Sequence, residues 1–136
     1  MTDKKEKYYI IDPNSNNIND SANLDYAKIL QSIHGGYEFM MRTYDVSIEE
    51  NQINFLFTKS QAYFYLYKKL NEYMNLNFEK EKIRSIYFHE IIHWLRLLPY
   101  KLKKDGKRAL IFYSGLLMVL NDVIEKYGDR DGNKKR

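Results

Sequence analysis

Residues 89–93 read His-Glu-Ile-Ile-His, and this HExxH pattern is the part of the sequence best suited to chemistry. On a helix, histidines four residues apart share a face, where two imidazoles can bind zinc while the intervening glutamate activates a metal-bound water. The pattern therefore supports one hypothesis, a zinc-dependent metallohydrolase of the zincin type. His89 and His93 would be the ligands and Glu90 the catalytic base.

A catalytic zinc site needs a third protein ligand. Downstream of the motif the sequence offers Glu125, with Asp122 as a second choice, and the extended pattern with a third histidine is missing. On a helical projection Lys82 and Arg96 share the strip of the two histidines, and cations beside a zinc ion oppose its binding. The sequence therefore favours a non-enzymatic protein without a cofactor, with an HExxH metalloprotease as the only enzymatic candidate.

Other catalytic patterns lack their partners. A di-iron bundle needs a second Glu-x-x-His beside the one formed by Glu90 and His93, and the chain has none. His34 stands alone beside two glycines, with no nucleophile to pair with. A glycine-rich phosphate loop is also missing.

Residues 80–108 carry nine Lys or Arg against three acidic residues, a net charge of +6 in a chain whose total is +4. Such clustering is typical of a surface that faces nucleic acid or an acidic protein, although a solvated helix face has the same composition. Phosphate binding of this kind is driven by counterion release, and Trp94 and Tyr100 add rings that can stack on single-stranded bases. The predicted binding residues are Lys80, Lys82, Arg84, Arg96, Tyr100, Lys101, Lys103, Lys104, Lys107 and Arg108.

Short stretches within residues 55–110 resemble a known family. Thr58 to Gln61 opens a helix, and Trp94 to Arg96 precedes Tyr100 and the basic Gly106 to Arg108. This order resembles the small helical subunit of type III CRISPR effector complexes. The resemblance implies a non-catalytic bundle that lines a filament in a multi-subunit complex and contacts guide and target nucleic acid through basic residues. The predicted last helix departs from the family because it lacks the Glu-Ala pair expected near its start.

The elements that position these residues belong to one domain's worth of chain, with 136 residues, 44% of them hydrophobic and 29% charged. The chain contains no cysteine, which excludes disulfides and thiolate metal sites and suggests a reducing compartment. Apolar spacing predicts an all-α, single-domain bundle of about four helices. A short N-terminal arm or a two-stranded β element can accompany it.

An unbroken apolar seam from Tyr26 to Tyr44 predicts one helix over about 24–44, bent at its two glycines, and the alternative is two helices broken at His34. Residues 45–52 are expected to be a polar connection, and the alternation over residues 53–57 indicates a strand, as residues 7–11 do more weakly. Tyrosines on such seams are expected to be mainly structural.

Three further helices are predicted. Thr58 and Gln61 fit a capping box that opens a helix ending near residue 75. The next helix spans about 79–98 and stops near Pro99, followed by a basic turn over residues 100–108. The last helix, about 107–127, is apolar on nearly every side, which places it in the middle of a bundle or against a partner.

The predicted divisions are an N-terminal arm and polar loop over 1–22, the helical bundle over 23–128 and a charged tail over 129–136. Residues 1–7 lack the apolar core of a signal peptide, and no stretch approaches the roughly 18 apolar residues of a membrane span. The expected location is therefore cytoplasmic, without membrane contact.

The favoured function is a small non-enzymatic binding or assembly subunit whose basic surface over residues 80–108 contacts nucleic acid or an acidic protein partner. The first alternative is the zinc-dependent metallohydrolase. The second is a homo-oligomeric helical scaffold that uses the Tyr26 to Tyr44 seam as its interface.

Overall fold

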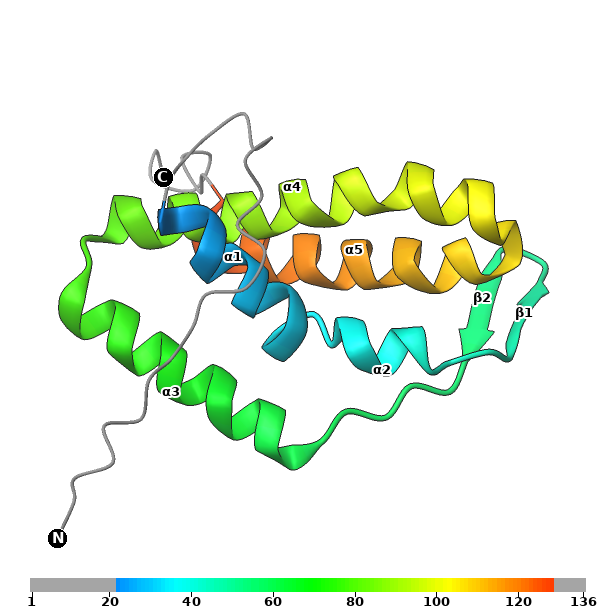
Figure 1. Cartoon of the computed structure of the whole chain (residues 1–136), viewed down its shortest axis with the longest axis horizontal. Coiled ribbons are helices and arrows are strands. Elements are labelled where there is room, and N and C mark those ends of the chain that lie inside the picture. Colours follow the sequence, from blue (N-terminus) through cyan, green and yellow to red (C-terminus); the bar gives the residue numbers. More distant parts are fainter. Residues whose placement is uncertain (1–21, 129–136) are drawn as a thin grey trace, which may run out of the picture.

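The computed structural model of the protein describes residues 22–128, so the predicted arm, the strand over residues 7–11 and the charged tail lie outside the described residues. The described part is mostly helical with one small antiparallel hairpin, which confirms the predicted fold class (Figure 1). The elements are α1 (Ala22–Ile33), α2 (Tyr37–Met41), β1 (Val46–Glu49), β2 (Gln52–Phe55), α3 (Gln61–Asn77), α4 (Lys80–Lys104) and α5 (Gly106–Tyr127).

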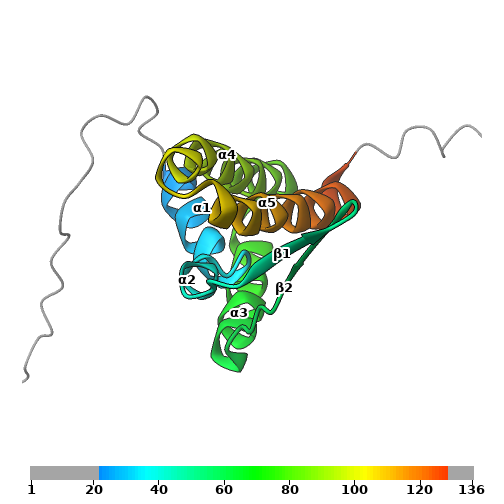
Figure 2. The same cartoon turned by 90° about the vertical axis from the view of Figure 1, so that its right-hand side faces the viewer.

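Helices α4 and α5 form a long pair that runs the length of the molecule, and α1 packs mainly against α4 (Figure 1). Helix α2 and the hairpin pack against α5, whereas α3 leans away from the pair (Figure 2) and reaches α5 through side chains, such as Tyr67 with Lys126. The largest fully buried side chains are Trp94, Tyr87, Phe112, Leu30 and Met40. Across residues 22–128, no helix combines the length and the apolar character that a membrane span requires.

The predicted single helix over 24–44 is wrong, and the alternative of two helices broken at His34 is confirmed. Gly36 has a φ of 71°, in the left-handed region that glycine tolerates best. A Cβ atom on Gly35 would lie 2.4 Å from the ring of Trp94. The backbone therefore turns at these glycines, and the ring of Trp94 packs against the turn.

Most of the Tyr26 to Tyr44 seam faces the protein's own core. Leu30, Ile33 and Met40 on it are buried, Tyr26 is half-buried, and Tyr44 at its end is 68% exposed. The buried part of the seam therefore packs within the chain, and the homo-oligomeric scaffold stays a prediction.

The predicted polar connection over residues 45–52 is wrong because it contains strand β1. Strands β1 and β2 pair in antiparallel register, with Val46 opposite Phe55 and Glu49 opposite Gln52. The predicted strand over residues 53–57 is confirmed as far as Phe55. Burial of Val46 at one end of the pair ties the hairpin to the core.

The predicted capping box at Thr58 is wrong by two residues. Ser60 is the N-cap of α3, and its hydroxyl accepts a hydrogen bond from the amide of Ala62 at 3.1 Å. Such a bond satisfies one of the amides that a helix leaves free at its start.

Helix α4 continues through Pro99 to Lys104, so its predicted end near Leu98 is wrong. Proline cannot donate to the carbonyl four residues earlier, which here belongs to Leu95. Both residues lie on the exposed side of α4, where water can bind that carbonyl. The predicted basic turn over 100–108 is wrong, because only Asp105 separates α4 from α5. Its carboxylate accepts hydrogen bonds from two amides of α5 at 3.1 and 3.3 Å.

Helix α5 confirms the predicted last helix in extent, but it does not lie in the middle of the bundle. One face buries Phe112, Val119 and Val123. Another face leaves Leu117 and Ile124 exposed, at 45% and 55%. An apolar strip of α5 therefore remains on the surface of the described chain.

Candidate functional site

The HExxH motif lies in the middle of α4, but its three side chains have different partners. Glu90 is fully buried, and its carboxylate contacts His34. Nδ1 of His89 lies 2.7 Å from a carbonyl one turn earlier in its own helix. Nε2 of His93 lies 3.3 Å from the carbonyl of Leu24 in α1. Glu90 and His93 therefore join α4 to neighbouring segments, whereas His89 contacts only its own helix.

The expected third zinc ligands, Glu125 and Asp122, lie on α5. Asp122 contacts His34, and Glu125 accepts from the amide of Asn121 at 3.5 Å. Within residues 22–128, no group of three His, Asp or Glu side chains has an arrangement that could hold a metal ion. The described residues thus give the zinc hypothesis no assembled ligand set.

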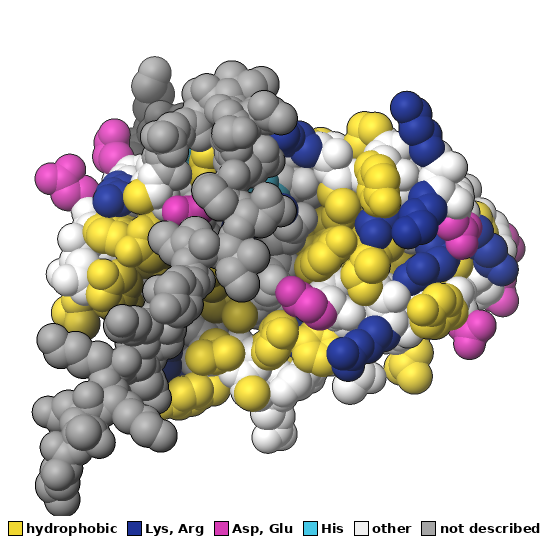
Figure 3. All heavy atoms as spheres, viewed as in Figure 1, with side chains coloured by type: hydrophobic (Ala, Val, Ile, Leu, Met, Phe, Trp, Pro, Cys, Tyr) yellow, Lys and Arg dark blue, Asp and Glu magenta, His cyan; other side chains and the backbone are white. Residues whose placement is uncertain are grey.

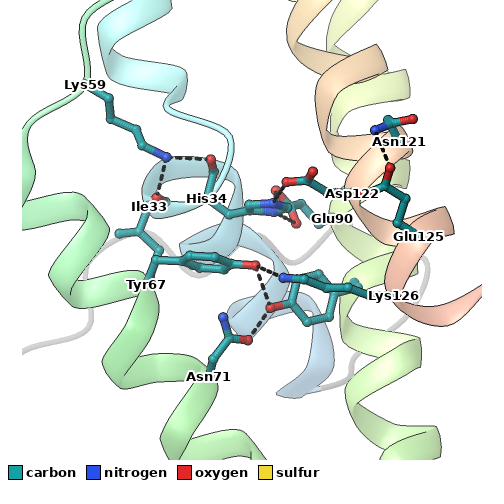
Figure 4. Close-up of polar contacts among 11 residues, drawn as sticks. Ile33, His34, Lys59, Tyr67, Asn71, Glu90, Asn121, Asp122, Glu125 and Lys126 are labelled. Atoms are coloured by element: carbon teal, nitrogen blue, oxygen red, sulfur yellow. Dashed lines mark hydrogen bonds and ion pairs between the residues drawn. The ribbon is translucent and has the colours of Figure 1, made fainter.

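His34, Glu90 and Asp122 form a network that joins the end of α1 to α4 and α5 (Figure 4). Nδ1 of His34 lies 2.8 Å from an oxygen of Glu90, and Nε2 lies 3.0 Å from an oxygen of Asp122. Ionised carboxylates only accept hydrogen bonds, so this geometry fits an imidazolium that donates from both nitrogens.

The protonation of the network follows from its burial. Burial lowers the pKa of His34, but the hydrogen bonds to Glu90 and Asp122 outweigh it and raise the pKa overall. Burial raises the pKa of Glu90, and the imidazolium of His34 offsets only part of that rise. The folded protein therefore holds protons at this network more tightly than the unfolded chain does. Because both nitrogens of His34 are occupied, the ring cannot take a proton from a substrate without losing a bond.

A second polar layer adjoins the network (Figure 4). The ring of Tyr67 stacks on His34 with centroids 4.7 Å apart, and its hydroxyl lies 2.7 Å from Nζ of Lys126 and 3.1 Å from the hydroxyl of Tyr87. The Tyr87 hydroxyl in turn donates to Asn71, and burial raises the pKa of Tyr87, so this group stays protonated. These contacts tie α3 to the main helix pair.

Lys59 closes the end of α1. Its Nζ donates to the carbonyls of Ile33 and His34 at 3.2 and 2.9 Å, which the helix itself leaves without partners. Beside it a pocket of about 390 Å³ opens between α3 and α5. Its lining consists of His34, Gly35, Phe57, Lys59, Phe64, Tyr67, Met118, Val119 and Asp122.

Sequence reasoning missed this network because it treated His34 as an isolated residue. The sequence signal that could have revealed the network is the position of Glu90 on the same helical face as the apolar residues of α4. Ile83, Tyr87, Glu90 and Trp94 follow one another at spacings of 4, 3 and 4, and all four are buried. A carboxylate on the buried face of a helix requires a partner in the core.

The predicted basic residues do not form one patch. At about 1.5 Å per residue, Lys80 and Lys103 lie about 35 Å apart at opposite ends of α4. Lys82 covers the ring of Phe78 at 4.0 Å near the first end. Lys and Arg side chains gather at the other end, where α4 meets α5 (Figure 3). We call one exposed surface at this end the basic face. It consists of Lys28 from α1 and of Arg96, Tyr100, Lys103 and Lys104 from α4.

Lys28 of α1 lies close enough to the rest of the basic face for its charge to act on the same histidine as that of Arg96. The pKa of His93 is lowered first by burial, and the charges of Lys28 and Arg96 lower it further. These residues line a shared pocket of about 470 Å³ together with Tyr100, whose side chain is 59% exposed. Positive charge and an exposed ring therefore meet at one place.

Several predicted binding residues have structural partners. Arg108 donates to the carbonyls of Met41 at 2.6 Å and Thr43 at 3.3 Å, while Lys101 is buried. Trp94 is fully buried, so the prediction that it stacks on bases is wrong. Lys107 and Arg84 are exposed, but Arg84 lies near the first end of α4, outside the basic face.

Sequence reasoning also missed two exposed residues at and just after the end of α2. Arg42 is exposed at the end of α2, and Tyr44 is 68% exposed with its ring 4.4 Å from the guanidinium carbon of Arg108. They lie some 60 residues before Arg108 in the chain, and no local pattern connects them.

Comparison with protein-family models, with curated proteins and with solved structures finds no match to this chain.

Proposed function

We propose that this protein is a small non-enzymatic binding subunit that contacts single-stranded nucleic acid through its basic face. The observation that carries the proposal is the pocket that Lys28 and Arg96 share with the exposed ring of Tyr100, with Lys103 and Lys104 exposed one turn further along α4. Each exposed cation can replace condensed counterions on a phosphate, and this favours binding without base-specific contacts.

Aromatic exposure favours nucleic acid over an acidic protein as the partner. A base can stack on Tyr100, and such stacking contributes about 1–3 kcal/mol per base. Tyr44, beside Arg108, extends the same combination of ring and cation. The sequence resemblance to CRISPR small subunits implies the same class of partner and stays a prediction.

A role within an assembly is supported by the apolar strip of α5. Tyr113, Leu117 and Ile124 recur at helical spacing and are 44%, 45% and 55% exposed. Apolar residues grouped on one face are typical of protein contact surfaces.

Charge reversal tests the location of the interface. Lys103→Glu with Lys104→Glu is expected to weaken binding of a mixed-sequence single-stranded oligonucleotide at least tenfold, measured by fluorescence anisotropy. Lys80→Glu with Arg84→Glu makes the same change in net charge about 30 Å or more away, several Debye lengths at physiological salt, and is expected to change affinity far less. Equal weakening by both pairs would show that only net charge matters and would contradict the proposed interface.

Tyr100→Ala separates the two partner classes. Loss of stacking should weaken binding of the oligonucleotide but leave binding of a polyglutamate peptide unchanged. Tight binding of polyglutamate, with no binding of the oligonucleotide, would instead identify an acidic protein as the partner.

A further inference from the structure

Lys101 is a buried cation without an anionic partner. The residue is 7% exposed, and its Nζ contacts the sulfur of Met41 at 3.0 Å. The ring of Phe112 lies 4.6 Å from the same nitrogen, and those of Tyr37 and Tyr100 lie at 5.7 Å. Among residues 22–128, no carboxylate forms an ion pair with it.

This arrangement is unfavourable for the protein alone. A thioether is a weak acceptor, and ring faces compensate only part of the cost of burying an ammonium group. Burial lowers the pKa of Lys101, and the charges of Lys104 and Arg108 lower it further. Three cations therefore gather where the protein supplies little negative charge.

The three cations line a pocket of about 200 Å³ with Met41, Asp105 and Phe112. The one carboxylate in the lining, that of Asp105, already accepts from two amides at the start of α5. The volume is below the roughly 300–1,000 Å³ of pockets for drug-sized ligands, which favours a small group.

Hydrogen-bond donors remain free around this pocket. An ammonium group has three N–H bonds, and only one of those on Lys101 can point at Met41. A guanidinium has five, and Arg108 uses two on the carbonyls of Met41 and Thr43. Lys104 makes no hydrogen bond to the described part of the chain and is exposed. Fixed donors of this number and charge match a tetrahedral oxyanion.

We infer that the pocket formed by Lys101, Lys104 and Arg108 binds one phosphate group. The assignment of that group to a nucleic acid rests on the proposed function, because Lys104 also belongs to the basic face. The binding of a phosphate group as such depends only on the pocket. Lys101 would be the fixed centre of the site, since its position is set by the packing of α2, α4 and α5.

Inorganic phosphate is the direct probe. The melting temperature of the full chain should rise with phosphate concentration beyond the rise in sodium chloride of equal ionic strength. Lys101→Met replaces the ammonium by an apolar chain of similar length, so its melting temperature without phosphate should equal or exceed that of the wild type. The same variant should lose the phosphate-specific rise.

Two further variants keep the test decisive if Lys101→Met fails to fold. Lys104→Met changes an exposed side chain and should weaken phosphate binding several-fold in isothermal titration. Lys107→Met removes one exposed charge next to the pocket, outside both its lining and the basic face, and should bind phosphate as the wild type does. A wild-type chain with no phosphate-specific effect, or equal binding by all three variants, would overturn the site.

Oligonucleotides identify the source of the phosphate. If a backbone phosphate occupies the pocket, Lys101→Met weakens 5′-phosphorylated and 5′-hydroxyl strands alike. If a terminal phosphate occupies it, only the phosphorylated strand is affected. If neither strand is affected while inorganic phosphate binding is lost, the ligand is a free phosphate. Oligonucleotide binding that persists without any phosphate site would leave the proposed function intact and refute only the pocket.

Discussion

Replacing His34 by alanine tests the role of the buried network. The substitution leaves the fully buried carboxylate of Glu90 without its cation. A buried unpaired carboxylate takes up a proton instead, and at pH 7 this costs about 3 kcal/mol relative to an unfolded glutamate with a pKa of 4.5. Loss of the stacking of His34 on Tyr67 adds about 1 kcal/mol. We expect a total near 4 kcal/mol, a large part of the roughly 5–15 kcal/mol that stabilises a domain.

The sign of the pH dependence distinguishes this mechanism from a simple packing defect. In the variant the imidazolium no longer offsets the effect of burial, so the pKa of Glu90 rises further above its unfolded value. Stability is then highest below pH 4.5 and falls by about 3 kcal/mol between pH 5 and 7. In the wild type the pKa values of both His34 and Glu90 are raised, so stability also falls as the pH rises, but less than in the variant because the imidazolium offsets part of the rise at Glu90. The part of that fall due to His34, whose unfolded pKa is 6.5, is about 1 kcal/mol.

Urea denaturation at pH 5 and pH 7 measures both effects. The loss of stability caused by His34→Ala should shrink at the lower pH, by up to about 2 kcal/mol. Glu90→Gln is the control, because its neutral amide does not titrate. The double variant His34→Ala with Glu90→Gln should therefore lose the extra pH dependence. A penalty for His34→Ala below about 1 kcal/mol, or one that is the same at both pH values, would refute the account of the network.

Two further predictions concern the backbone. Gly35→Ala should destabilise the protein by about 1–3 kcal/mol in thermal denaturation, because its Cβ would lie 2.4 Å from the ring of Trp94. Gly106→Ala is the matched control, since nothing lies within 4 Å of a Cβ there, and a cost equal to that of Gly35→Ala would contradict the packing argument. Ser60→Ala should cost about 0.5–2 kcal/mol as the loss of the N-cap of α3, whereas Thr58→Ala should cost little. If Thr58→Ala lowered the denaturant midpoint more than Ser60→Ala did, Thr58 would be the N-cap, as the sequence predicted.

The extents of α3 and α5 and the start of α4 were predictable because their apolar periodicity is local. The break after Ile33 was predictable only as an alternative, since the seam stays in phase across it and the packing of Trp94 on Gly35 joins residues 59 positions apart. The continuation of α4 past Pro99 was not predictable from the local tendency of proline to end a helix, because it depends on the carbonyl of Leu95 lying on the exposed side of the folded chain.

The candidate sites divide in the same way. The charge excess over residues 80–108 was visible in the sequence, but a helix of 25 residues separates it into two ends. HExxH suggested a metal site because its spacing suits zinc, whereas Glu90 is in phase with the buried residues of α4 and pairs with His34. Sequence spacing cannot show whether a charged side chain on a helix points to solvent or to the core.

The salt dependence of oligonucleotide binding tests the central claim most directly. Affinity for a mixed-sequence single strand should be measured over a series of salt concentrations from about 50 to 200 mM. For three to five phosphate contacts, the account predicts a linear fall of log K with log salt concentration, with a slope of about −2 to −4. Absent binding at the lowest salt, or a slope near zero, would contradict it.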